Sequence, residues 1–330
     1  MPEATPSLAT PEDARRFLLK ARALRHAEPD EFAAAAALAA AIGESLPARS
    51  ADATDSEDAD DDARATADLK AELWAEVGNA RRVLGLHAAA EDAFTRAGEL
   101  LAAGRGEPQP AAAVSLLVAA LLADQRRFDD ALRLLEQARA LFARRGDRHA
   151  TGETFVHEGL IRFNRQEAIP AARLFSAALC LLEPARGSKM IFSAVHNLAV
   201  CAVQLGDFAR AETILAASED LYAELGGEII ELRRRWLLAR IAASTGREAE
   251  AAEILDDLRR CYARRGLGLD EATATLDLAL VSLSLGRTSG ILGHLAGALR
   301  VFRSLRIERE ALAVIVLLEN SLRAEEAALA

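Results

Sequence analysis

Residues of the same kind recur every 40 or 41 positions along most of this 330-residue chain. One column contains only small residues: Gly78, Ala119, Gly159, Ala199, Ala239 and Ala279. Twelve residues after each of these, alanine occupies five of the six places, and sixteen residues after each, all six places hold a large apolar residue. A period of this length is typical of an array of repeated units, each too small to bury its own apolar face alone.

Each repeat is expected to contain two helices. Hydrophobic residues make up 51% of the chain but aromatic residues only 5%, and alanine, leucine and arginine, which dominate, favour helices over strands. Seven residues after each small residue, glycine occupies four of six places, which suits a tight turn with positive φ. The small residue and the alanine column then mark where the two helices cross closely. The pattern predicts an all-α fold of about six helix pairs.

The clearest repeat carries a known spacing of residues, namely Trp74, Val77, Gly78, Gly85, Ala90, Phe94 and Ala97. This pattern resembles the tetratricopeptide repeat, in a form with 40 residues rather than about 34. Long repeats of this kind are similar to those of bacterial regulatory and sensor proteins, kinesin light chains and LGN-like adaptors. The resemblance covers residues 67–325 and implies a right-handed α-solenoid with its first helices lining a concave groove.

The period places the repeat boundaries. We expect repeats at 67–106, 107–146, 147–187, 188–226, 227–266 and 267–306, followed by a capping helix at 308–325. A cap is expected to be polar on its outer face, because nothing covers it.

The residues before the array predict three further segments: a disordered tail at 1–10, a helix pair at 11–48, and an acidic flexible linker at 49–66. The linker carries seven acidic residues and no apolar residue larger than alanine. The helix pair either stacks on the first repeat, which Phe32, Ala35 and Ala39 favour because they keep the repeat register, or folds elsewhere, including over the groove.

Charge and targeting signals narrow the possible functions. Acidic residues outnumber basic ones 50 to 40, which argues against direct nucleic-acid binding. The longest uncharged apolar stretch is Ala111–Ala123, too short to cross a membrane, which takes about 20 residues. The chain starts without a signal-peptide pattern, and its three cysteines form no CxxC pair. We therefore expect a cytoplasmic protein with reduced thiols and no membrane partner.

The sequence contains none of the common nucleophile, phosphate-loop or zinc-helix motifs. The aspartates at 58–62 read as a solvated loop more readily than as a cation site, since flexible acidic loops bind cations weakly. His157 and His196 occupy nearly equivalent places in neighbouring repeats, but no further metal ligand is in register with them. We expect no cofactor, no metal and no enzymatic activity.

The resemblance implies which residues line the groove. An inward asparagine, such as Asn79 or Asn197, can bond the backbone of an extended peptide through both its donor and its acceptor. Arg233, Trp236 and Arg240 share one helical face and could grip an acidic group. The alternative is that these side chains only form local polar networks and packing contacts. The candidates are Asn79, Arg82, His157, Asn164, His196, Asn197, Gln204, Arg233, Trp236 and Arg240.

The leading hypothesis is therefore a non-catalytic scaffold of the bacterial regulatory or signalling kind, which binds a protein or peptide segment in its groove. The partner is expected to carry acidic or carboxylate groups near Arg233 and Arg240. The alternative is a sensor of a ligand or signal peptide that relays to a transcription factor or effector enzyme. An enzyme is the third and least favoured reading, and no oligomeric state is specified.

Overall fold

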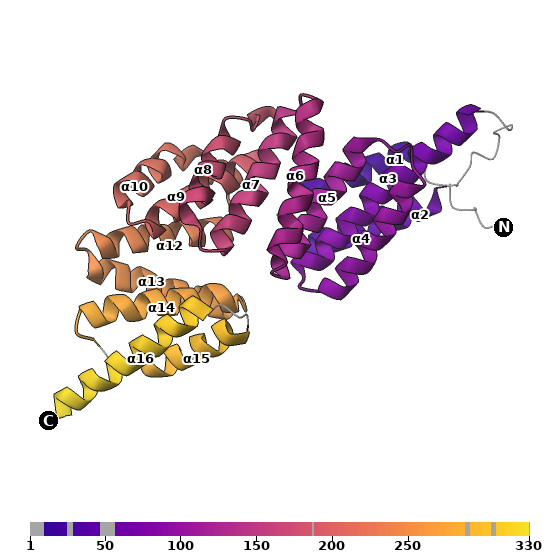
Figure 1. Ribbon diagram of the computed structural model, residues 1–330. Helices are drawn as coiled ribbons and strands as arrows, with labels where there is room; N and C mark the ends of the chain where they lie inside the picture. Colours follow the sequence, from indigo (N-terminus) through magenta and orange to yellow (C-terminus); the bar gives the residue numbers. More distant parts are fainter. Residues whose placement is uncertain are drawn as a thin grey trace, which may run out of the picture. The chain divides into compact units, whose positions relative to one another are not determined.

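The computed structural model describes residues 10–24, 29–46, 57–186, 188–287, 291–304 and 308–329. These residues form sixteen α-helices, one short 3₁₀-helix and no strand (Figure 1). The prediction of an all-α repeat fold is confirmed. In the described part of the chain, every helix is too short or too polar to cross a membrane.

The helices group into two compact units. The first unit comprises Met1–Glu167 and Ala177–Arg186, and the second comprises Ala168–Ser176 and Gly187–Ala330. The first unit contains α1 (Pro11–Leu24), α2 (Pro29–Ser45), α3 (Glu57–Val83), α4 (His87–Ala102), α5 (Pro108–Asp124), α6 (Phe128–Arg144) and α7 (Arg148–Asn164). Helix α8 (Ala168–Leu179) contributes residues to both units. The second unit contains α9 (Ser188–Gln204), α10 (Phe208–Ala217), α11 (Glu219–Leu225), α12 (Glu228–Ser244), α13 (Glu248–Arg264), α14 (Gly268–Ser284), α15 (Ile291–Ser304) and α16 (Glu308–Leu329).

The turn between the two helices of each pair repeats one backbone geometry. The residue seven places after the small column has positive φ in all six repeats, between 63° and 80°, although Arg126 and Gln166 replace glycine in two of them. At Gly206 the next amide closes the helix end, because Asp207 N donates to Ala202 O over 2.9 Å. This bond back over five residues is the Schellman motif, which satisfies a carbonyl at the helix end.

Small residues allow the close helix crossings that the sequence predicts. A Cβ atom at Gly78 of α3 would lie 2.8 Å from the ring of Phe94 on α4, so no larger residue fits there. In the second unit, Ala239 of α12 and Ala251 of α13 are fully buried in one cluster with Leu255. These small residues therefore let the backbones of paired helices come close together.

Helices α1 and α2 stack on the first repeat. Leu18 and Ala39 pack with Leu69 and Leu73 of α3, and Phe32 is fully buried in a neighbouring cluster. This is the first of the two placements that the sequence leaves open. The predicted disordered tail at 1–10 lies outside the described residues, except for Thr10. Thr10 instead caps α1, since its hydroxyl accepts from Asp13 N over 3.2 Å.

The prediction of a flexible acidic linker at 49–66 is wrong for residues 57–66. Residues 47–56 lie outside the described residues, but α3 begins at Glu57, so residues 57–66 are helical. Carboxylates in a first helical turn are stabilised by the helix dipole, which explains why this acidic run can extend the helix. Asp61 also binds the Arg105 side chain, with Nε donating to Oδ1 over 2.8 Å.

The last helix departs from expectation on its outer face. Ala311, Val314 and Leu317 of α16 are buried against α14 and α15, as a cap requires. The other face carries Leu312 and Val316, which are 62% and 47% exposed. The prediction of a polar outer face is wrong here, because apolar residues repeat on both sides of this helix.

The positive φ at the inter-helix turn predicts that replacing its glycine destabilises the fold. Substitution Gly206→Ala is expected to lower the free energy of unfolding by about 1 kcal/mol, because a Cβ disfavours this backbone region. No heavy atom lies within 4 Å of the added Cβ, so the effect is conformational and not steric. The matched control is Gly297→Ala in the middle of α15, which should instead stabilise by up to about 1 kcal/mol. Urea titrations measure both, and equal effects would contradict this account.

Candidate functional site

Within each unit, the first helix of one pair lies beside the first helix of the next pair. In the first unit the row runs α1, α3, α5, α7, and in the second unit it runs α9, α12, α14. Side chains on these rows form the inner face where the sequence places all ten candidates. Four candidates lie in the first unit and six in the second.

Asn79 and Arg82 meet in the first unit and form a polar network. The Asn79 carbonyl oxygen accepts from two Arg82 nitrogens over 3.0 and 3.1 Å. Arg82 also donates to Asp124 of α5 over 2.7 Å. Asn79 is only 4% exposed and holds Arg82, and Arg82 in turn links α3 to α5. This arrangement matches the local-network alternative for Asn79 better than peptide binding.

Two further candidates lie on α7. His157 is half-buried near the middle of the helix, whereas Asn164 is its last residue and is exposed. They belong to the first unit, whereas His196 belongs to the second.

Trp236 and Arg240 form a cluster in the second unit around an acid from the neighbouring first helix. The Trp236 indole N–H donates to Asp277 of α14 over 2.8 Å. The Arg240 guanidinium stacks over the indole ring, 5.2 Å from its centre, with its Nε 3.9 Å from Asp277. Burial raises the pKa of Asp277, and Arg240 and the indole N–H partly oppose that rise. Asp277 therefore fixes the indole, and the indole positions Arg240.

His196 is a buried residue of α9 and not an exposed groove residue. Its ring stacks on Phe192, and its Nδ1 lies 2.9 Å from the Tyr222 hydroxyl of α11. Burial, together with the charge of Arg233, lowers the pKa of His196 to about 4. The ring is therefore neutral at physiological pH and serves packing.

The other candidates of the second unit keep some access to solvent. Asn197 is half-buried and donates from Nδ2 to Ser193 O of its own helix over 2.8 Å. Gln204 is half-buried at the end of α9. Arg233 is exposed on α12 and, within the described residues, makes no ion pair.

The sequence candidates omit the acids that organise these contacts. Asp124 and Asp277 lie 42 and 41 residues after Arg82 and Trp236, close to one repeat length. Because one period carries a residue to the same place on the next first helix, a polar pair separated by one period plus a residue or two indicates a contact across the inner face. This spacing could have identified both acids from the sequence.

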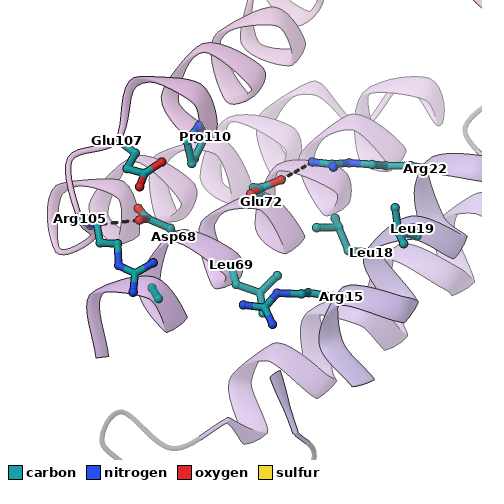
Figure 2. Close-up of a pocket in the computed structure, with 11 residues that line it drawn as sticks. Arg15, Leu18, Leu19, Arg22, Asp68, Leu69, Glu72, Arg105, Glu107 and Pro110 are labelled. Atoms are coloured by element: carbon teal, nitrogen blue, oxygen red, sulfur yellow. Dashed lines mark hydrogen bonds and ion pairs between the residues drawn. The ribbon is translucent and has the colours of Figure 1, made fainter. Parts of the chain in front are cut away.

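A hollow that the repeat pattern does not reveal lies on the inner face of the first unit, between α1, α3 and the start of α5 (Figure 2). Its volume is about 350 Å³. None of the ten sequence candidates lines it.

The low pKa of His196 predicts a loss of stability in acid. In the unfolded chain this group takes up a proton near pH 6.5, but in the folded chain only near pH 4, so acidification across that range favours unfolding. Between pH 7 and pH 5 we expect a loss of about 2 kcal/mol that His196→Gln abolishes. Urea titration followed by Trp236 fluorescence in a Trp74→Phe background measures it. An equal loss in the variant would contradict the assignment.

Comparisons with known proteins agree with the architecture. No family model and no curated protein matches the sequence. Among solved structures, the apo quorum sensor NprR from B. thuringiensis aligns with a TM-score of 0.61 at 11% identity, over 93% of this chain and 81% of that one. A Rap protein complexed with competence and sporulation factor gives 0.54 at 15% identity, over 96% and 99%. The Rap conjugation gene regulator of plasmid pLS20, in complex with the Phr* peptide, gives 0.53 at 12% identity, over 95% of each chain. The chain therefore shares the helical-repeat fold of these solved structures.

Proposed function

We propose that this chain is a non-catalytic scaffold that binds an acidic peptide segment on the inner face of its second unit. The binding surface consists of Asn197 on α9 and of Arg233, Trp236 and Arg240 on α12. We place the protein among cytoplasmic bacterial regulators, in line with its excess of arginine over lysine and with the solved structures that share its fold.

The observation that carries the proposal is the state of the two arginines. Arg233 is an exposed cation without an ion pair in the described part of the chain, and Arg240 is held on an indole with only a long contact to Asp277. A guanidinium has five donors, so both groups retain donors for a partner. Seven residues of helix separate them by about 10 Å, so each can bind its own carboxylate on one bound segment.

Trp236 adds an apolar contact area to the two arginines, and Asn197 adds a group that can bond a peptide backbone. The indole is half-buried and offers apolar area beside the charges, with its orientation fixed by Asp277. Asn197 uses one amide hydrogen on its own helix, which leaves further bonding capacity for a peptide backbone. Together they favour an extended acidic segment over a free anion.

The solved structures support peptide binding as a use of this fold. One of them holds the Phr* peptide, and another is a quorum sensor. The same resemblance favours the second candidate function, in which the bound peptide is a signal relayed to a transcription factor or effector enzyme.

The binding test uses an array of acidic peptides and the same peptides with every Glu replaced by Gln. Arg233→Gln and Arg240→Gln are each expected to weaken binding of acidic peptides about tenfold or more, because each removes a charge-assisted contact. The matched control is Arg234→Gln, which removes a cation of the same helix that is already paired with Glu231. Fluorescence polarisation measures the dissociation constants. Equal binding of acidic and neutralised peptides, or unchanged binding when Arg233→Gln and Arg240→Gln are combined in one chain, would refute the surface.

A second measurement separates a sensor from a scaffold. If the protein is a sensor, the peptide changes the affinity for a second, effector protein, and linkage requires the effector to change the peptide affinity by the same factor. Isothermal titration of the peptide with and without the captured effector tests this reciprocity. A scaffold binds both with unchanged constants.

A further inference from the structure

The hollow on the inner face of the first unit is built from two matching helix faces. Helix α1 contributes residues 15, 18, 19 and 22, and α3 contributes residues 65, 68, 69 and 72. Both sets follow the i, i+3, i+4, i+7 spacing of a single helical face. Residue 65 lies in the extra N-terminal part of α3, so the early start of this helix extends the wall of the hollow.

Apolar side chains form the floor. Leu18 of α1 and Leu69 of α3 are buried, 5% and 6% exposed, and they pack together in one cluster. Leu19 also lines the hollow and is 65% exposed, so it can cover an apolar group placed there.

Most charges around the hollow are already engaged. Arg22 pairs with Glu72 and Glu76, and the Arg105 side chain binds Asp61. Asp68 is 8% exposed and accepts from Arg105 N over 3.1 Å.

Two opposite charges at the hollow form no ion pair with any residue that the structure describes. Within the described residues, neither Arg15 nor Glu107 makes an ion pair, and Glu107 precedes α5 without capping it through its side chain. Figure 2 shows Arg15 entering from α1 on one side and Glu107 standing with Asp68 on the other. Within the described residues, the hollow thus has an unpaired cation, Arg15, on one wall and an apolar floor. The facing wall carries Glu107, which forms no ion pair although its negative charge, after the hydrogen bond to Asp61, helps to raise the pKa of Arg105.

We infer that this hollow binds a small zwitterion with an apolar side chain, such as a free amino acid or a dipeptide. The ligand carboxylate pairs with Arg15, its ammonium group pairs with Glu107 and Asp68, and its side chain rests on Leu18 and Leu69. Three arginines and three acids line the hollow, so a ligand with a net charge would leave one wall unmatched. A volume of about 350 Å³ lies at the lower end for small-molecule sites, which fits a ligand of this size.

The probes are L-leucine and the dipeptide leucyl-alanine, titrated into the full chain and followed by calorimetry and by ligand-observed NMR. Leucinamide lacks the carboxylate, and N-acetyl-leucine lacks the ammonium group. Each is expected to bind at least tenfold more weakly than leucine, because each loses one charge-assisted pair.

Variants on each wall test which residue binds which charged group of the ligand. Arg15→Gln and Glu107→Gln are each expected to weaken leucine binding at least tenfold. The matched control, Arg16→Gln, changes an exposed arginine of the same helix that does not line the hollow, and leaves binding unchanged. Leucinamide should be insensitive to Arg15→Gln, and N-acetyl-leucine insensitive to Glu107→Gln.

Three outcomes would overturn the inference: no binding of either zwitterion at millimolar concentration, binding of N-acetyl-leucine or leucinamide as tight as that of leucine, or equal loss in Arg16→Gln. The result does not depend on the acidic-peptide surface, because that surface lies entirely in the second unit.

Discussion

The close approach of paired helices at small residues is the constraint on which the rest of this structure depends. Gly78 lies against the Phe94 ring, and Ala239 and Ala251 are fully buried at the corresponding crossing in the second unit. Because the backbones come so near, the second helix of each pair fills the outer side and leaves the first helices to contact one another. The row of first helices, and every polar contact upon it, follows from that arrangement.

The repeat fold could be predicted almost completely from the sequence, because it is carried by residues whose backbone demands are strict. Even Arg126 and Gln166 adopt the positive φ that glycine adopts elsewhere in their column, so the register specifies the turn and the residue adapts to it. The start of α3 at Glu57 could not be predicted in this way. Its acidic residues read as solvated chain, and what holds them in a helix is the dipole together with Arg105, more than forty residues later.

The candidate site could be predicted only in part from the sequence. The period identifies which side chains face inward, but not which of them satisfy each other. The Asn79 carbonyl oxygen accepts from Arg82, and His196 is buried beside Tyr222, whereas Arg233 stays exposed. These outcomes depend on contacts between neighbouring first helices, such as that of Trp236 with Asp277. The two residues of such a contact lie about one full repeat apart in the sequence. The hollow beside α1 was missed because it needs an element outside the repeat register.

Packing between consecutive helices also shapes how the chain is made. Each pair in the array finds its core in residues close to it in sequence, which favours rapid formation from local contacts. During synthesis a pair can therefore close once the next first helix has left the ribosome, as α5 and α6 do against Ala150 and Ile161 of α7. The N-terminal pair follows the same rule, since Leu18 and Ala39 are covered by Leu69 and Leu73 of α3. Although it precedes the array, its apolar face is sheltered only after α3 has been made.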